Sequence, residues 1–166
     1  MKIGIIGAGN LGQSIAKGIL HSDGATSMYL SKRNTASLEG FKKFNQVTLT
    51  TQNVTLVKHS DILIFAVQPS QFQDILTEIK EFLTEKHVLI STITGFSIQK
   101  MEALIGHHHF IVRAMPNTAI SVGASMTCLC ANEAGAKRIA IAKAIFDRMG
   151  KTMTIPETKM QAATVI

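Results

Sequence analysis

An α/β fold is predicted, with a doubly wound and mostly parallel sheet that carries helices on both faces. Short apolar runs typical of buried strands alternate with stretches whose apolar residues recur at helical spacing. The run 3–6 leads directly into Gly7-Ala8-Gly9-Asn10-Leu11-Gly12, a glycine pattern that joins a strand to a helix in folds of this class. The chain of 166 residues is long enough for one domain of ordinary size.

The first half of the chain supplies the strands on which this fold is built. Apolar or β-prone runs predict strands over 3–6, 27–30, 47–50 and 62–67. After the glycine pattern, Leu11, Ile15 and Ile19 recur at every fourth position and predict a helix, and a shorter helix is expected over 53–59. Because 62–67 is the most continuous apolar run, we place it at the centre of the sheet, covered on both faces.

The second half continues the same alternation of strands and helices. After Pro69, the next helix carries its apolar residues on one face, at Phe72, Ile75, Leu76, Ile79, Phe82 and Leu83. Further strands are expected over 88–91, 110–113 and about 121–130. A last helix carries Ile141, Ala142, Ile145, Phe146 and Met149 on one side. Gly150 is placed to cap the end of that helix.

Charge and composition limit the classes of partner. The 17 Lys and Arg residues outnumber the 11 Asp and Glu, and the net charge of +6 indicates an anionic partner. Tyr29 is the only tyrosine and tryptophan is absent, so side chains that could stack on nucleic-acid bases are scarce and nucleic acid is not expected. No apolar run approaches the roughly 18 residues of a membrane span. We therefore expect a cytoplasmic protein without a membrane partner.

Cysteine and histidine give no predicted metal site. Cys128 and Cys130 lie two apart in an extended stretch, where a disulfide would be strained, and partners at metal-ligand spacing are missing. Buried free thiols are therefore expected. His107, His108 and His109 cannot all point at one ion from a loop or strand, so a solvent-exposed turn is predicted there.

The glycine pattern has the context that a dinucleotide requires. Gly7 permits a tight turn, Gly9 lets the backbone approach a pyrophosphate, and Gly12 allows the helix to pack closely on the strand. The free N–H groups and the positive end of the helix dipole then hold the phosphates. We predict a Rossmann-like dinucleotide-binding domain with its site at this turn.

The end of the second strand favours NADP over NAD. A fold of this kind that binds NAD usually offers Asp or Glu to the ribose hydroxyls about 20 residues after the glycines. Here the sequence reads Leu30-Ser31-Lys32-Arg33-Asn34, without an acid. Ser31 can hydrogen-bond a 2′-phosphate, and the guanidinium of Arg33 can bind the same phosphate through charge-assisted hydrogen bonds. NADPH is therefore the expected cofactor, with NADH as the alternative.

The segment Arg113-Ala114-Met115-Pro116-Asn117-Thr118 is more specific than the glycine pattern. Together with that pattern, Asn53, 59–61, 66–69 and Thr94-Gly95, it makes the whole chain resemble the N-terminal half of pyrroline-5-carboxylate reductase. That family catalyses the last step of proline biosynthesis, the NADPH-dependent reduction of 1-pyrroline-5-carboxylate to L-proline. The resemblance implies that this chain is the cofactor-binding part of such an enzyme.

The resemblance also implies where cofactor and substrate lie. The expected cofactor-binding residues are Gly7, Gly9, Asn10, Leu11, Gly12, Ser31, Arg33, Asn34, Asn53, Ala66, Val67, Gln68, Pro69, Thr94 and Gly95. Of these, 66–69 and Thr94-Gly95 would line the path to the nicotinamide. The expected substrate-proximal residues are Met115, Pro116, Asn117 and Thr118. None of them is an obvious acid for the imine nitrogen, so no catalytic residue is assigned.

The chain departs from the family pattern in three places. Gln68 stands where the family commonly has Lys, and Ala119-Ile120 replaces the usual Pro-Ala. The sequence ends at 163–166, where the family continues into a helical domain that forms the dimer and supplies most substrate contacts. We therefore expect a dinucleotide-binding domain over 1–156. Residues 157–166 would begin that helical domain, through which the longer protein would form a homo-oligomer.

Two other functions remain open. Another two-domain NADP-dependent imine or hydroxyacid reductase would share the glycine pattern and the strand order, because its specificity lies in the second domain. A non-catalytic NADPH-binding module would instead use the apolar end Thr164-Val165-Ile166 as a docking surface.

Overall fold

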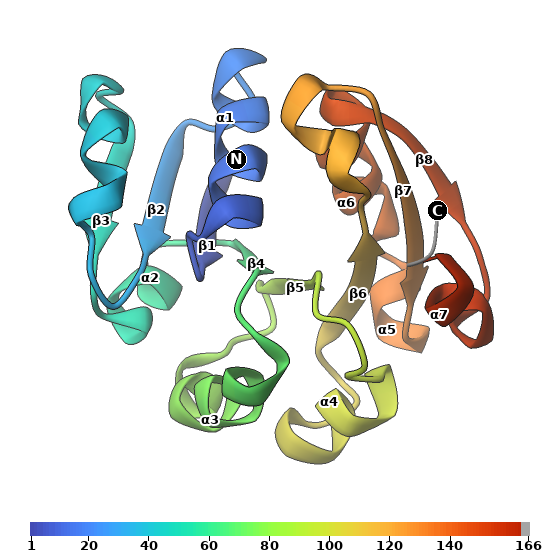
Figure 1. The fold of residues 1–166 in the computed structure, drawn as a ribbon. Helices are drawn as coiled ribbons and strands as arrows, with labels where there is room; N and C mark the ends of the chain where they lie inside the picture. The colour runs from blue at the N-terminus through green and yellow to red at the C-terminus, as the bar shows by residue number, and fades with distance from the viewer. Residues whose placement is uncertain (164–166) are drawn as a thin grey trace.

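A single twisted sheet forms the centre of the molecule, which we describe from a computed structural model over residues 1–163. Across these residues, eight strands lie in the order β3-β2-β1-β4-β5-β6-β7-β8 (Figure 1). Their bounds are β1 Lys2–Ile6, β2 Ser27–Ser31, β3 Val47–Thr50, β4 Ile62–Phe65, β5 Val88–Ser91, β6 Phe110–Met115, β7 Ser125–Ala131 and β8 Gly150–Thr154. All neighbouring strands are parallel except β6 and β7, so the predicted fold class is confirmed.

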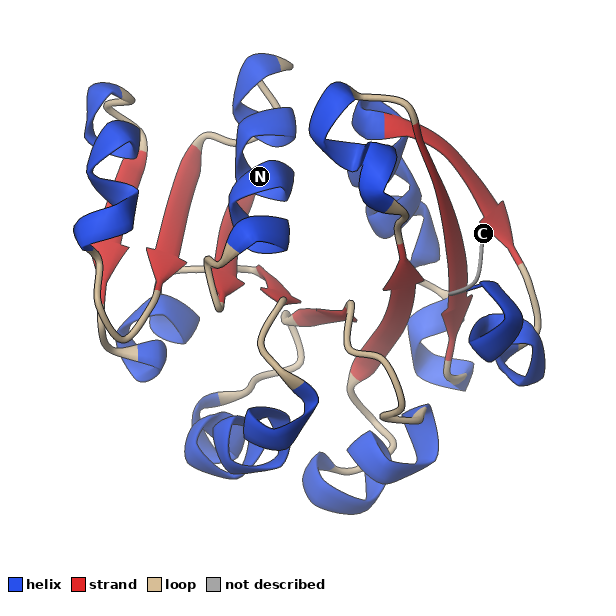
Figure 2. Ribbon diagram, viewed as in Figure 1, coloured by secondary structure: helices blue, strands red, loops and turns tan. Residues whose placement is uncertain are grey.

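Helices cover both faces of the sheet (Figure 2). On one face lie α1 Asn10–His21, the 3₁₀ segment η1 Ala36–Lys43 and α6 Ile139–Phe146; on the other lie α2 Asn53–Lys58, α3 Pro69–Ile79, α4 Ile98–Ile105 and α7 Met160–Ala163. The shorter segments are η2 Lys80–Phe82, η3 Thr118–Val122, α5 Glu133–Ala136, η4 Asp147–Met149 and η5 Glu157–Lys159. None of the helices within 1–163 has the length and apolar character that a membrane crossing requires.

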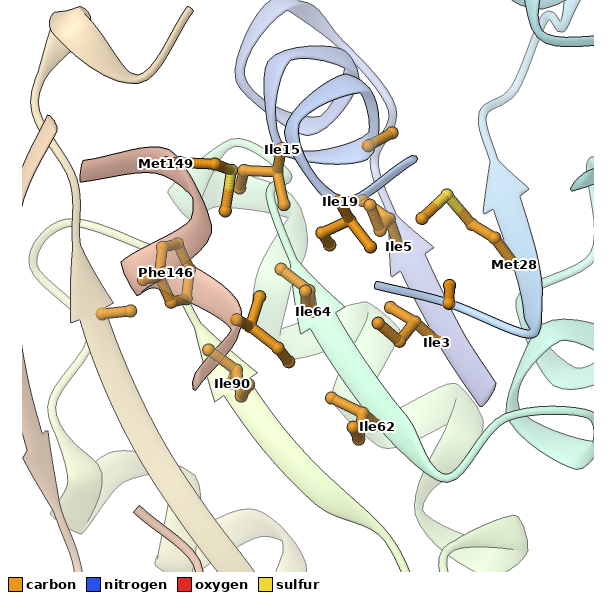
Figure 3. Packing of buried hydrophobic residues seen from close by; sticks show 14 of the residues in the cluster. Ile3, Ile5, Ile15, Ile19, Met28, Ile62, Ile64, Ile90, Phe146 and Met149 are labelled. Carbon is orange, nitrogen blue, oxygen red and sulfur yellow. The ribbon is translucent and has the colours of Figure 1, made fainter. Parts of the chain in front are cut away.

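Alternation along the central strands divides the core into two layers. In β1, Ile3 and Ile5 face α1 and pack with its Ile15 and Ile19 (Figure 3), whereas Ile6 belongs to the opposite layer. The same alternation runs through β4 and β5, which are buried on both faces. Each fully buried isoleucine stabilises the fold by about 1.5–3 kcal/mol relative to exposure. Two-sided burial thus explains the apolar run over Ile62–Phe65, whereas Ala66 and Val67, predicted in the same strand, lie beyond its end and are half-buried.

The end of the sheet departs from the sequence prediction. Gly150 is the C-cap residue of η4, the 3₁₀ turn that continues α6, as predicted, and it also begins β8, an edge strand that was not predicted from the sequence. Its φ is +143°, and a Cβ there would lie 1.9 Å from the carbonyl oxygen of Ser125 on the neighbouring strand. The strand escaped prediction because its residues are largely exposed, so its sequence lacks the apolar run of a central strand. In addition, β7 begins at Ser125, and the segment before it is η3.

The histidine turn is only partly as predicted. His107 and His108 are exposed, but His109 is buried where the chain enters β6, and burial lowers its pKa. Cys128 and Cys130 are buried free thiols, as expected, and burial raises the pKa of Cys130 to about 11. Within residues 1–163, no group of three or more His, Cys, Asp or Glu is arranged to hold a metal ion. The apolar end at 164–166 lies outside the described residues.

Candidate functional site

A cavity of about 810 Å³ opens at the carboxyl ends of β1 and β4. From β1 the chain builds the sheet outward through β2 and β3, and then returns to β4 on the other side of β1. Ligands of open α/β sheets bind at such a reversal, because the flanking loops diverge to opposite faces and leave a crevice. The cavity is lined by Ile6, Gly7, Gly9, Ser31, Lys32, Arg33, Asn34, Thr51, Asn53, Ala66, Val67, Gln68, Ser70, Gln71, Asp74, Ile75 and Glu78.

The glycine turn after β1 is shaped by close packing at two of its glycines. Gly7 has φ +89°, and a Cβ there would lie 2.4 Å from the Cγ1 atom of Val67. A Cβ on Gly12 would lie 2.6 Å from the carbonyl oxygen of Gly7. The N–H groups of Gly7 and Ala8 both donate to the carbonyl oxygen of Ser31, at 3.1 and 2.9 Å, which fastens the turn to the end of β2.

Gly9 differs from those two glycines because it faces open space. No heavy atom lies within 4 Å of the position that its Cβ would take, and it lines the cavity. It is also the N-cap residue of α1, without a side chain to cap the helix, and the first turn of α1 contains no acid. The first N–H groups of a helix have no partner within the helix and carry its positive dipole end. The open cradle at Gly9 therefore fits a phosphate group of a dinucleotide.

A chain of hydrogen bonds crosses the cavity from β2 to α3. Buried Ser31 donates from its hydroxyl to Oδ1 of Asn53 at 2.8 Å, and Nδ2 of Asn53 donates to Oε2 of Glu78 at 3.2 Å. An ionised carboxylate only accepts, so Glu78 fixes the orientation of the Asn53 amide. Because Oδ1 of that amide then faces Ser31, it accepts the hydroxyl proton of Ser31. Ser31 thus presents lone pairs to the cavity, and Asn53 retains one free N–H.

Charges of both signs face this cavity. The exposed Arg33 and the partly buried Lys32 follow β2, and the Lys32 ammonium donates to the Ser37 hydroxyl at 2.8 Å. On the opposite wall, Asp74 and Glu78 lie one helical turn apart on α3 and bring two negative charges. The basic side suits an anionic group such as a phosphate, and the acidic side suits donors such as hydroxyl or amino groups.

The wall of the cavity that α3 forms was not predicted from the sequence. Ser70, Gln71, Asp74, Ile75 and Glu78 recur at helical spacing and share one face of α3. The buried face of this helix was predicted, but Ile75, which was placed on that face, is half-buried and lines the cavity. Phe72 and Ile79 are buried against the sheet. The polar residues Asp74 and Glu78, which lie one helical turn apart, must therefore lie on the other side of the helix.

The predicted site residues fall into three groups. Nine of them line the cavity, namely Gly7, Gly9, Ser31, Arg33, Asn34, Asn53, Ala66, Val67 and Gln68. Four lie in the helices that begin beside it: Asn10, Leu11 and Gly12 in α1, and Pro69 as the first residue of α3. The remaining residues do not line it and lie at or just beyond the carboxyl ends of β5 and β6, namely Thr94, Gly95, Met115, Pro116, Asn117 and Thr118.

The segment after β6 is held by its own hydrogen bonds. Met115 is the buried last residue of that strand. Asn117 accepts from the N–H of Ala119 at 3.2 Å through its side chain and donates from its own N–H to Ser125 Oγ at 3.3 Å. These contacts fix the backbone of the turn and add no charged group to it.

Comparison with known proteins agrees with the resemblance noted in the sequence. Residues 2–95 match a family model described as NADP oxidoreductase, coenzyme F420-dependent. Pyrroline-5-carboxylate reductase 1 of Dictyostelium discoideum is 35% identical over 99% of this chain and 32% of its own length. Pyrroline-5-carboxylate reductase 2 of the same organism is 32% identical over 99% of this chain and 60% of its own length.

Solved structures give the same picture for the fold. A pyrroline-5-carboxylate reductase from Coxiella burnetii superposes with a TM-score of 0.92 at 29% identity, covering 99% of this chain and 63% of that one. The Plasmodium falciparum pyrroline carboxylate reductase, solved with NADP bound, superposes with a TM-score of 0.87 at 29% identity, covering 100% of this chain and 62% of that one. This chain therefore spans less than two thirds of these relatives.

Proposed function

We infer a function for this chain from its family, since it belongs to the family described as NADP oxidoreductase, coenzyme F420-dependent. We propose that it binds NADPH for the reduction of 1-pyrroline-5-carboxylate to L-proline. The relatives that it resembles over nearly its whole length carry the name of that enzyme, and one of them was solved with NADP. The same proposal makes it the cofactor-binding part of a longer reductase.

The observation that carries the proposal is the open cradle at Gly9 beside a basic rim. The uncapped N-terminus of α1 accepts a pyrophosphate, and Ser31, Arg33 and Asn53 stand at the same cavity for the adenosine end. Arg33 is the residue that distinguishes a 2′-phosphate from a free hydroxyl, because its guanidinium pairs with the phosphate oxygens. Gln68 lines the cavity without bringing a charge.

Bound NADPH would supply the hydride that reduces the imine carbon. The residues of this chain bind and orient the cofactor: the glycine turn holds its phosphates, and Thr94 with Gly95 stands at the nicotinamide end. Met115 to Thr118, at the end of the neighbouring strand β6, would border the substrate. In this proposal no residue of the chain donates the proton to the imine nitrogen, so the chain acts by positioning.

The proposal extends to the organisation of the longer protein. Residues 1–156 form the cofactor domain, and 157–166 begin a helical domain that completes the substrate site and joins two or more copies. The proposed substrate is a small anion, with no nucleic acid or membrane as partner, and the proposed location is the cytoplasm.

Calorimetric titration of the chain with NADPH and, in parallel, NADH tests the proposal. NADPH is expected to bind more tightly, because Arg33 meets the 2′-phosphate. If neither dinucleotide binds, the cavity is not a cofactor site and the proposal fails. Equal binding of both would remove the role given to Arg33. The substrate is tested in the whole protein that carries this chain, by the loss of NADPH absorbance on addition of pyrroline-5-carboxylate.

A further inference from the structure

The loop between β5 and α4 has a buried stem and an exposed tip. Thr92 and Ile93 are buried at its start and Ile98 at its end, whereas Thr94 and Gly95 are exposed. Both the backbone N–H and the hydroxyl of Thr92 donate to the carbonyl oxygen of Phe65, at 3.0 and 2.7 Å. This anchors the start of the loop to the end of β4, beside the cavity.

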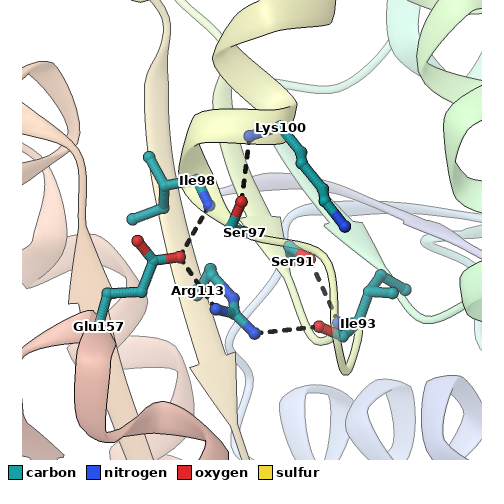
Figure 4. Close-up of polar contacts among 7 residues, drawn as sticks. All are labelled: Ser91, Ile93, Ser97, Ile98, Lys100, Arg113 and Glu157. Carbon is teal, nitrogen blue, oxygen red and sulfur yellow. Dashed lines mark hydrogen bonds and ion pairs between the residues drawn. The ribbon is translucent and has the colours of Figure 1, made fainter.

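One ion pair contacts this loop at both ends (Figure 4). Nη1 of Arg113 lies 2.9 Å from Oε1 of Glu157, and the same oxygen accepts from the backbone N–H of Ile98 at 2.7 Å. Nη2 of Arg113 donates to the carbonyl oxygen of Ile93 at 3.4 Å. Arg113 comes from β6 and Glu157 from η5, so two segments that are far apart in the sequence together hold the two ends of this loop.

Arg113 is buried and Glu157 is partly buried, and stability alone is a weak explanation for such a pair. The side chain of Arg113 is 8% exposed and that of Glu157 is 32% exposed. Removing such charges from water costs about as much as their attraction returns, so a buried pair is weak evidence for stabilisation. The hydrogen bonds of this pair to the backbone of Ile93 and Ile98, on the other hand, fix the two ends of the loop that carries Thr94 and Gly95.

The tip that this stem supports is shaped for close approach. Gly95 has φ +74°, a conformation that residues with a Cβ rarely adopt, and no heavy atom lies within 4 Å of the position its Cβ would take. Phe96, the next residue, packs against Phe72 of α3 with ring centroids 4.9 Å apart. The backbone at Thr94 and Gly95 is therefore exposed but held from both sides.

We propose that Arg113 and Glu157 are positioning residues, which hold the Thr94-Gly95 tip against the nicotinamide end of the bound cofactor. This inference rests on the proposed function. It also links the cofactor site to the segment after β8, because the acid that fixes the loop comes from η5. A displacement of that segment would then move the tip without touching the cavity beside Gly9.

Two ligands separate this role from a general loss of structure. NADPH reaches the tip, whereas adenosine 2′,5′-bisphosphate contains only the adenosine end that the cavity holds. The double variant Arg113→Met/Glu157→Met removes both charges together, so that neither is left buried without a partner. Its affinity for NADPH is expected to fall about tenfold, which corresponds to about 1.4 kcal/mol, while its affinity for the bisphosphate stays within about twofold.

Two further variants sharpen the result. Glu157→Gln retains an oxygen that accepts from Ile98 and Arg113, so its NADPH affinity is expected within about twofold of the wild type. Glu85→Gln removes an exposed acid from another loop and serves as the charge-matched control, without effect on either ligand. Backbone amide signals of Thr94 and Gly95 are expected to shift on NADPH addition in the wild type and to shift less in the double variant.

The outcomes distinguish the inference from the proposed function. Equal weakening of both ligands, or of neither, in the folded double variant would overturn the positioning role. A Glu157→Gln variant as weak as the double variant would also overturn it, since charge alone would then be responsible. Wild-type chain that binds neither ligand would refute the proposed function itself.

Discussion

At the cavity between β1 and β4 polar side chains face one another, whereas at the loop after β5 an exposed backbone tip stands on a buried stem. The cavity end is built from Ser31, Asn53 and Glu78, which are joined by hydrogen bonds and border the glycine turn. The tip end offers Thr94 and Gly95, whose position depends on Arg113 and Glu157 behind them. In the proposed function, affinity and alignment are therefore separable: side chains around the cavity would bind the adenosine end of the cofactor, and a supported backbone would orient the nicotinamide end.

The largest expected effect on stability and binding comes from a substitution in the glycine turn after β1. Gly7→Ala places a Cβ within 2.4 Å of Val67 in a positive-φ conformation. We expect the free energy of unfolding to fall by about 3 kcal/mol and NADPH binding to be lost. Denaturant unfolding and calorimetry measure the two effects.

Gly9→Ala is the matched control for this variant. Its added methyl group meets no atom of the chain and φ is −79°, so the free energy of unfolding should fall by about 1 kcal/mol or less. NADPH affinity should nevertheless drop at least about tenfold, because the methyl group occupies the phosphate cradle. Unchanged affinity would place the pyrophosphate elsewhere.

A smaller effect is expected at the rim of the cavity. Arg33→Ala removes the guanidinium that would pair with a 2′-phosphate, so NADPH affinity should fall about tenfold while NADH affinity changes less than about twofold. Calorimetry with both cofactors measures the ratio. Lys151→Ala, which removes an exposed charge on the distant edge strand β8, should leave both affinities unchanged. A parallel loss of NADH binding would contradict the assignment of Arg33 to the 2′-phosphate.

The smallest effect concerns the acid at the far end of the hydrogen-bond chain. Glu78→Gln introduces a donor beside Asn53, which allows that amide to turn and frees the Ser31 proton for a phosphate oxygen. NADPH affinity is expected to rise about threefold, with little change for NADH. Asp74→Asn is the control, because it removes the same charge from α3 and the cavity, whereas the Asn53 amide donates to Glu78. An equal gain in that control would assign the effect to charge alone.

The parts of the fold that the sequence predicted are those with a local signature. Ile3, Ile5 and Ile6 alternate between two core layers, and Leu11, Ile15 and Ile19 follow the turn of α1, so strand and helix were both visible. The glycine turn was visible because each glycine has a backbone reason to be there. The edge strand β8 was not, since its exposed residues leave little hydrophobic pattern.

The candidate site divides in the same way. Ser31 and Arg33 were found from their distance to the glycine turn, which the strand–helix–strand unit sets. Glu78 was missed because it lies 25 residues after Asn53 in the sequence. The two side chains meet only because α3, which carries Glu78, packs beside α2 on the sheet, and no local pattern predicts that contact.

The sequence by itself therefore determined the strands and helices that carry a clear apolar period, the glycine turn after β1 and the basic residues that follow β2, but not β8 or α4. The physical reason is that periodicity and glycine conformation are properties of residues close together in the chain. Only the tertiary structure decided that Arg113 and Glu157, 44 residues apart, meet at the stem of one loop. That contact depends on the strand order, which brings β6 beside β5, and on the course of the chain after β8, and neither leaves a mark on the local pattern.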